Sequence, residues 1–412
     1  EWVVGGIEAK VPAYGLVLMG LAEIIRRRWS RGWVWFGGAS AFHVLTGGWA
    51  VVAAMVSFVV TERLFRRRDE SPVRFFSAGL FIGGGLALFG LWPALRLTLD
   101  ASPQENVMAA RIYSYYRISH HLLPGNFPTH WFIRQGILAA GLIAAVCCGR
   151  PTSAQRRVLW VAMAALLIAA CGLIVGVLPA YEPDLAAKLL RYYWFRLSDA
   201  MVPLALAFWL MGCWDGNEQR EQPRVPTLRG GNRVAWLAFL IAAGLFGWSS
   251  YQRNRFGIPP STRHRLLGFH PDATVTEQRR SHADWLAVCD WARVATPEEE
   301  IFLTPRHQQT FKWYSGRAEV VNWKDVPQDA ASLLKWKRRF DDVYPKSLGA
   351  VRLGSMRVPI SYAKLKEYRK DYRVRFMVVD NRIATKQLPL VKIYPVGDQT
   401  NATYSVYELP ND

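Results

Sequence analysis

Basic and aromatic side chains crowd one polar stretch between two apolar runs, residues 98–131. From Arg111 it reads RIYSYYRISHHLLPGNFPTHW, which brings Arg111, Arg117, His120 and His121 into a short span. Arginine binds phosphate through paired N–H groups, and histidine can donate to phosphate or transfer protons. We predict that Arg111 and Arg117 bind a lipid phosphate and that His120 and His121 are candidate catalytic groups. The alternative is an interfacial loop whose polar side chains only solvate the membrane surface.

A second polar stretch, residues 180–200, carries basic side chains at helical spacing. Lys188 and Arg191 are three residues apart and share a helical face; Arg196 and Asp199 do the same and can pair. We predict that Lys188, Arg191 and Arg196 complete the phosphate site, because this stretch and residues 98–131 are expected on the same side of the membrane. The alternative is a polar loop with a local salt bridge of little energetic weight.

Three further ionisable residues lie at or within apolar runs. Glu8 and Lys10 precede the first run, where a charged pair either anchors the interface or faces a cavity, and Glu8 is a further candidate catalytic group. His43 lies inside an apolar run, three residues before Thr46. An intramembrane histidine is a functional candidate, although a structural hydrogen bond to a nearby carbonyl explains it equally well.

The spacing of histidines, cysteines and glycines gives little indication of a metal, redox or nucleotide site. His120, His121 and His130 could bind zinc only with difficulty, because adjacent histidines seldom chelate one ion together. The cysteines form no CxxC pair: Cys147, Cys148, Cys171 and Cys213 lie in or beside apolar runs, and Cys289 is alone in the polar region. No GxGxxG or GxxxxGK[ST] motif occurs, and the adjacent Asp341 and Asp342 point apart on a helix. We therefore predict no metal and name no cofactor.

The elements that must position these residues are membrane helices. Of the 412 residues 51% are hydrophobic, and the apolar runs lie before about residue 250. Runs near 20 residues are long enough to span a bilayer, and the candidates are 11–25, 34–60, 74–97, 132–149, 158–179, 201–214 and 234–250. The net charge of +19 comes largely from arginines at the ends of these runs, a pattern of membrane orientation rather than of nucleic-acid binding.

Arginine clusters predict the orientation of the spans. They follow the first span, separate the second from the third and the fourth from the fifth, and precede the last. Their members are Arg26, Arg27, Arg28, Arg31, Arg63, Arg66, Arg67, Arg68, Arg74, Arg150, Arg156, Arg157, Arg220, Arg224, Arg229 and Arg233. The positive-inside rule places all four clusters in the cytoplasm. Segment 34–60 then has cytoplasmic flanks at both ends, so we predict a re-entrant hairpin broken at Thr46-Gly47-Gly48; one long tilted span is the alternative.

The remaining chain reads as a linker, residues 251–278, followed by a soluble α/β domain, residues 279–412. Helices are predicted at 276–293, 329–344 and 361–371, and strands at 301–303, 317–323, 376–379, 389–394 and 402–408. Alternating helices and short apolar strands favour a three-layer or Rossmann-like domain. With the hairpin, this domain and residues 98–131 and 180–200 all fall outside the cytoplasm.

Six strings resemble a poorly characterised bacterial family of polytopic membrane proteins. They are GGIEAKVPAY (5–14), AFHVLTGGWA (41–50), RISHHLLP (117–124), RLSD (196–199) and the pair ATPEEEIFLTP and RAEVVNWKDVP in the polar region. That family is similar in organisation to GT-C glycosyltransferases, which transfer sugar from a polyprenyl-phosphate carrier. The resemblance implies a GT-C-like helical membrane bundle with a small α/β domain, located in the bacterial inner membrane. It also implies that the arginines and histidines of 98–131 bind the carrier's phosphate.

The resemblance leaves the catalytic acid open. GT-C enzymes carry it in the first extracytoplasmic loop, and this chain begins with Glu1 rather than Met, so we expect that the segment holding the acid precedes it. Two alternatives stand beside the glycosyltransferase. A transporter or lipid-handling protein predicts a central cavity and often internal repeats, and a membrane-anchored assembly protein predicts a packed bundle with an exposed apolar patch on the soluble domain.

Overall fold

The structure is a computed structural model. It describes residues 9–66, 71–149, 151–214, single positions between 240 and 255, and then 273–306, 308–344, 361–382 and 388–411. The chain divides into two compact units: a helical unit made mainly of Glu1–Thr227, and an α/β unit made mainly of Leu228–Gln328 and Ser332–Asp412. Most of the predicted span 234–250 and of the linker 251–278 lies outside the described residues. The last residues of the predicted linker form the start of a helix, which begins at Val275.

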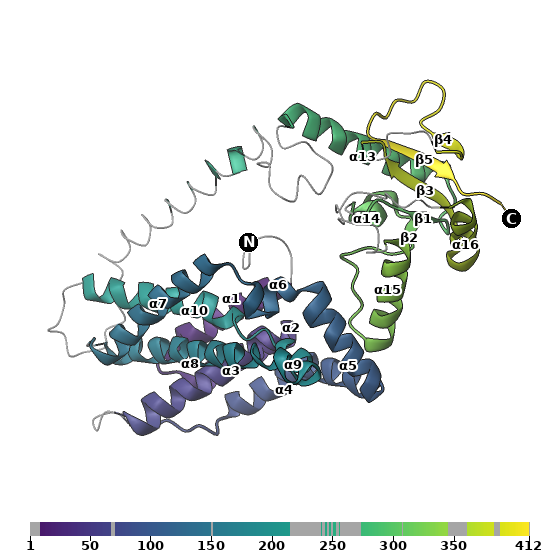
Figure 1. Ribbon diagram of the computed structural model, residues 1–412. Helices are drawn as coiled ribbons and strands as arrows, with labels where there is room; N and C mark the ends of the chain where they lie inside the picture. The colour runs from purple at the N-terminus through teal and green to yellow at the C-terminus, as the bar shows by residue number, and fades with distance from the viewer. Residues whose placement is uncertain are drawn as a thin grey trace. The chain divides into compact units, whose positions relative to one another are not determined.

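Helices make up the described part of the first unit (Figure 1). They are α1 (Lys10–Ile25), α2 (Trp29–Phe42), α3 (Val44–Phe58), η1 (Val59–Leu64), α4 (Ala78–Leu99), α5 (Pro103–Arg111), η2 (Ile112–Arg117), α6 (Ser119–Leu122), η3 (Pro124–Asn126), α7 (Thr129–Cys147), α8 (Ser153–Val175), η4 (Leu178–Ala180), α9 (Pro183–Leu190) and α10 (Arg196–Trp214). In the part of the chain that the structure describes, four stretches are long and apolar enough to cross a membrane: Val44–Leu64, Ala78–Leu99, Thr129–Cys147 and Ser153–Ala180. This agrees with the prediction of a membrane protein.

The segment predicted as a hairpin folds as two helices, but the break lies elsewhere. α2 ends at Phe42 and α3 begins at Val44, so the chain turns at His43 and not at Thr46-Gly47-Gly48. The His43 imidazole Nδ1 accepts the Thr46 backbone N–H at 3.1 Å and caps α3. Gly47 lies inside α3 against the backbone of Ser40, where a side chain would overlap it. The glycine therefore permits close approach of the two helices rather than the turn.

The first four long helices alternate in direction around this turn. Phe58, near the end of α3, packs edge-on against Trp29 at the start of α2, so the two helices run antiparallel. Gly79 of α4 lies against Ser30, and Gly90 against Ser40, so α4 runs parallel to α2. Gly83 lies against the Trp33 carbonyl in the same row, and a Cβ there would overlap the α2 backbone. Small residues spaced in this way allow close helix packing in membranes.

One end of the helical unit, which we call the His43 end, gathers the short helices of both polar stretches. There α3 begins and α8 finishes, and Trp49 of α3 donates to the Tyr192 carbonyl at 2.6 Å. The ring of Trp194 covers Gly172 of α8 and lies 4.9 Å from that of Trp49. The long stretch 98–131 is thus folded into α5, η2, α6 and η3, and its position at this end brings it beside residues 183–196.

The opposite end contains a buried ionic network, which we call the carboxylate network: Arg27, Trp29, Glu62 and Arg157. Glu62 lies in the π-helix η1 and is 2% exposed. It accepts hydrogen bonds from Arg27 Nη2 at 2.7 Å, Trp29 Nε1 at 3.0 Å and Arg157 Nε at 3.0 Å. Arg157 also donates to the Ile25 carbonyl at 3.2 Å. The network joins the α1–α2 connection, η1 and the start of α8.

The second unit is built on a five-stranded mixed sheet. Its elements are α13 (Val275–Ala295), β1 (Ile301–Leu303), α14 (Phe311–Ser315), β2 (Ala318–Glu319), α15 (Ala330–Val343), α16 (Tyr362–Tyr372), β3 (Val374–Asp380), β4 (Val391–Tyr394) and β5 (Tyr404–Glu408). The strand order is β2-β1-β3-β5-β4, with β2, β1 and β3 parallel and β5 antiparallel to both of its neighbours. The strand predicted at 317–323 is shortened to Ala318–Glu319.

Both faces of the sheet are covered. Phe376 and Val378 of β3 share a core with Trp285 of α13, and Met377 and Val379, which alternate with them, are also buried. On the side of α15 and α16, the Tyr344 hydroxyl donates to the Thr304 carbonyl and the Tyr368 hydroxyl to the Asp342 carbonyl. The unit is therefore a small three-layer α/β domain, one of the two architectures predicted.

Candidate functional site

Five basic side chains from four segments come together at the His43 end of the helical unit. This basic cluster consists of Lys10 (α1), Arg117 (η2), His120 and His121 (α6) and Arg196 (α10). His121 lies within the electrostatic reach of the other four, and its ring centroid is 4.0 Å from that of His120. Segments almost 190 residues apart in sequence thus place positive charge around one imidazole.

Hydrogen bonds between the two polar stretches hold Arg117 and α6 in place. The hydroxyls of Tyr113 and Tyr193 lie 3.0 Å apart, and Ser114, which is fully buried, donates to the Ala187 carbonyl at 2.8 Å. The Tyr115 hydroxyl donates to the Pro183 carbonyl at 2.6 Å. Tyr113, Ser114 and Tyr115 lie in the π-helix η2, whose i→i+5 turns end at Arg117. The π-helix therefore docks on α9 and carries Arg117 to the cluster.

Arg196 is positioned by aromatic residues on either side. Its guanidinium lies 4.0 Å from the centroid of the Tyr193 ring, a cation–π contact, and its carbonyl accepts the Tyr14 hydroxyl at 3.1 Å. Tyr193 has a φ of 52°, in the left-handed region that bulky residues rarely adopt. Strained backbone of this kind persists where surrounding contacts enforce it, and it is concentrated at functional sites.

Burial and neighbouring basic side chains lower the pKa values of the two histidines in the cluster. Burial, followed by the basic groups His120, Arg196, Arg117 and Lys10, lowers the pKa of His121 to about 4. Burial and then Arg117 lower the pKa of His120. Burial also lowers the pKa of Arg117, with Tyr113 and Tyr193 opposing the effect. Both imidazoles are thus neutral near pH 7, and they stand among fixed positive charges.

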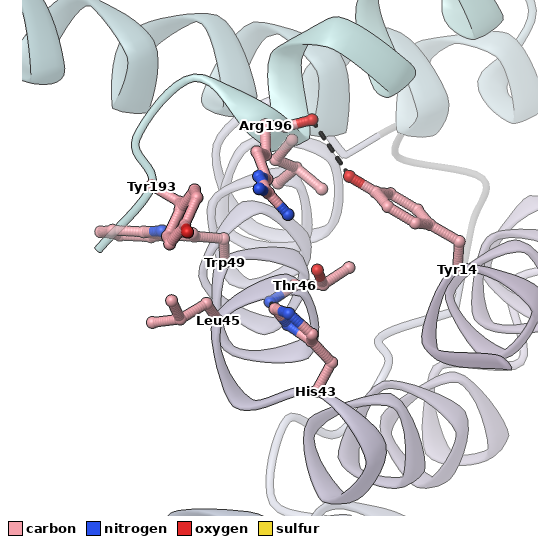
Figure 2. Close-up of a pocket in the computed structure, with 8 residues that line it drawn as sticks. Tyr14, His43, Leu45, Thr46, Trp49, Tyr193 and Arg196 are labelled. Atoms are coloured by element: carbon pink, nitrogen blue, oxygen red, sulfur yellow. Dashed lines mark hydrogen bonds between the residues drawn. The ribbon is translucent and has the colours of Figure 1, made fainter. Parts of the chain in front are cut away.

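A small pocket adjoins Arg196 (Figure 2). It is lined by Tyr14, His43, Leu45, Thr46, Trp49, Tyr193, Arg196 and Leu197. Figure 2 shows the Arg196 guanidinium and the His43 imidazole directed toward one another across it. Its volume of about 10 Å³ is close to that of one water-sized sphere. A lipid head group is too large for this pocket.

The other predicted site residues lie apart from the cluster. Arg111 pairs with Asp184 on α9, and both side chains are about half exposed. Lys188 is exposed and Arg191 is half-buried, and neither acts on His121. Glu8 lies outside the described residues. Of the predicted phosphate-binding arginines, Arg117 and Arg196 are therefore the two that the fold brings together.

Several residues of the site were not predicted from the sequence. Tyr14 and Tyr193 position Arg196, and the charge of Arg134 on α7 acts on Asp199 together with that of Arg196. The signal for Arg134 was an arginine one turn inside an otherwise apolar run. Glu62 had the same kind of signal, an acid at the end of the run beginning at Val44.

Possible metal ligands were searched over the part of the chain that the structure describes. Within it, no three His, Cys, Asp or Glu side chains lie together in a way that could hold a metal ion. His120 and His121 are adjacent, but the groups around them are cationic, and a second charge of the same sign would be repelled.

Comparison with known proteins gives one match. A family model described as a domain of unknown function, DUF6798, matches residues 283–343, a stretch that runs from within α13 to the end of α15 and includes β1 and β2. No curated protein and no solved structure matches the chain.

Proposed function

We propose that the helical unit binds the phosphate of a membrane lipid at the basic cluster. The observation that supports this most directly is the surroundings of His121, where basic side chains from α1, η2, α6 and α10 converge. Charge-assisted hydrogen bonds from arginine are the strongest contacts a protein offers phosphate. The cluster also lies at one end of helices long enough to cross a bilayer, where lipid head groups are found.

The reaction that fits this site and the family resemblance is GT-C-like glycosyl transfer from a polyprenyl-phosphate-linked sugar. In that reaction the bond between the anomeric carbon and the phosphate oxygen breaks, and the leaving phosphate gains a negative charge. Arg117, Arg196 and Lys10 would stabilise that charge. Asp199, whose carboxylate lies near Arg196 and Arg134, could accept the proton of the acceptor hydroxyl. In this proposal the C-terminal unit and the basic cluster lie outside the cytoplasm of a bacterial inner membrane.

Binding of undecaprenyl phosphate to the full chain in phosphatidylcholine nanodiscs tests the proposal. Arg117→Ala and Arg196→Ala should each weaken binding about tenfold or more, because each removes a charge-assisted contact. Arg111→Ala is the matched control: its partner is Asp184, and binding should change less than about twofold. Equal affinities in all three variants would remove the basis of the proposal.

A second measurement separates transfer from binding. The same nanodiscs, given a polyprenyl-phosphate hexose and a hydroxyl acceptor, water included, to receive the sugar, should release free polyprenyl phosphate in the wild type and not in the Arg117→Ala/His120→Ala double variant. Binding without release would support the lipid-handling alternative, in which the same cluster holds the lipid and no bond is broken.

A further inference from the structure

Charge is distributed unevenly between the two helical layers of the α/β unit. α13, which covers one face of the sheet, carries three arginines and three carboxylates. α15 and α16, on the other side of the sheet, together carry eight lysines and arginines but four carboxylates. A solvated protein surface usually mixes both signs, as α13 does. The excess of positive charge on the α15–α16 layer therefore calls for a separate explanation.

Most carboxylates of this layer are occupied by contacts within it. Asp342 pairs with Lys364 at 2.8 Å and accepts the Tyr372 hydroxyl at 2.8 Å, which joins α15 to α16. Glu367 also pairs with Lys364, at 2.9 Å, and Asp341 pairs with the lysine one turn before it. Three of the four acids thus have basic partners inside the layer, and they do not balance its remaining cations.

Six basic side chains of this layer make no ion pair in the part of the chain that the structure describes. They are Lys335, Arg338, Arg339, Lys366, Lys370 and Arg373, the last of which directly follows α16. Lys366 is half-buried and the other five are exposed. We call this set the outer basic face.

The fold holds the outer basic face on the side of the two helices that points away from the sheet. The inward side of α15 contains Trp336, and that of α16 contains Leu365 and Tyr368, all of which are buried. The Arg339 guanidinium lies 6.0 Å from the centroid of the Tyr372 ring, so the charged row of α15 reaches α16. Within each helix the outward charges recur at spacings of three or four residues, at which like charges repel. An anionic surface against this face would relieve that repulsion.

We propose that the outer basic face docks the α/β unit onto the anionic phospholipids of the bilayer in which the helical unit lies. Clustered lysines and arginines are attracted to anionic lipid, and each one near the surface strengthens binding about fivefold. Four stretches of the described helical unit are long and apolar enough to cross a bilayer, so head groups are present at high effective concentration without a second protein. This inference is independent of the basic cluster and of the phosphate proposed to bind there.

Acetylation of the native lysines measures this docking on the full chain. The chain is placed in nanodiscs of phosphatidylcholine, or of phosphatidylcholine mixed with phosphatidylglycerol, and the rate at each lysine is followed by mass spectrometry. In the anionic mixture we expect acetylation of Lys335, Lys366 and Lys370 to slow at least about fivefold. Lys312 of α14, whose helix shares the core of α13, is the control and should keep its rate. Sodium chloride near 1 M should abolish the slowing, because it screens exposed charges.

A charge-neutralised variant tests the residues themselves. Arg338→Gln/Arg339→Gln keeps the three reporter lysines and removes two charges, so their rates in the two lipid compositions should agree within about twofold. The matched control Arg280→Gln/Arg293→Gln removes two arginines from α13 and should behave as the wild type.

Three results would overturn the inference. They are equal lysine rates in the two lipid compositions for the wild type, a slowing that persists in high salt, and equal effects of the two double variants. Slowing by soluble polyglutamate but not by phosphatidylglycerol would assign an acidic protein partner instead, and would overturn it as well. The proposed function is tested separately, because Arg338→Gln/Arg339→Gln should bind undecaprenyl phosphate as the wild type does.

Discussion

Removal of the Glu62 carboxylate tests what holds the opposite end of the helical unit together. The Glu62→Gln substitution keeps the size of the side chain and one carbonyl oxygen, but it replaces an acceptor with an N–H donor. That donor would face the guanidinium groups of Arg27 or Arg157, which are themselves donors. The variant thus removes the charge and one acceptor and leaves the packing unchanged.

The expected cost follows from burial. Arg157 is 5% exposed, and its side chain reaches the Ile25 carbonyl, so it cannot turn to water when Glu62 loses its charge. Removing one partner of a buried ion pair costs about 3–5 kcal/mol, because the remaining charge stays desolvated. Arg27 contributes less, since its side chain is 20% exposed and also donates to the Ser71 carbonyl. We therefore expect the free energy of unfolding to fall by about 3–5 kcal/mol.

The assay is equilibrium unfolding of the purified chain in detergent micelles. Asp100→Asn is the matched carboxylate-to-amide control: Asp100 pairs with Arg96 on α4, and both side chains are about 70% exposed. Its effect should stay within about 0.5 kcal/mol. A further Arg157→Met substitution should recover part of the loss of Glu62→Gln, because it removes the buried positive charge that Glu62 balanced. A Glu62→Gln effect no larger than that of Asp100→Asn would refute the reasoning.

Two further predictions concern packing and pH. Gly83→Ala should lower the thermal midpoint of the full chain, at a cost of about 1–3 kcal/mol, because its Cβ would overlap the Trp33 carbonyl, whereas the adjacent Gly84→Ala meets open space and should be neutral or slightly stabilising. In the α/β unit, burial raises the pKa of Glu319 despite hydrogen bonds from Thr304 and Asn322. A raised folded-state pKa favours folding at low pH and loses that contribution as pH rises through it, so Glu319→Gln should raise the thermal midpoint at pH 8 and not at pH 4.

Periodic patterns predicted the secondary structure well where side chains alternate clearly. The helices at 276–293, 329–344 and 361–371 and the strand at 301–303 were close to the observed elements. The strand at 317–323 was too long. After Glu319 the chain turns, and the Asn322 side chain accepts the Lys324 N–H while its amide donates to Glu319. Side-chain bonds of this kind compete with a strand and leave no mark on hydropathy.

The position of the turn between α2 and α3, and the identity of the residues that form the site, were harder to predict. A glycine pair is the usual signal for a break, but the His43 imidazole caps α3 and makes the turn three residues earlier. Arg111 and Arg117 looked equivalent in the sequence. The π-helix η2 follows Arg111 and ends at Arg117, and of these two arginines only Arg117 acts on His121. Which arginines converge depended on tertiary contacts such as that between Tyr113 and Tyr193.

The π-helix η1, which contains Glu62, also limits which deletions the protein can tolerate. A π-helix holds one residue more than the α-helix it interrupts, so deletion of one residue within 59–64 would restore regular winding. Each residue advances a regular helix by 100°, and the carboxylate would then turn away from Arg27 and Arg157. Single-residue gaps in this stretch, in contrast to those in the connections between helices, should be selected against unless the acid moves with them.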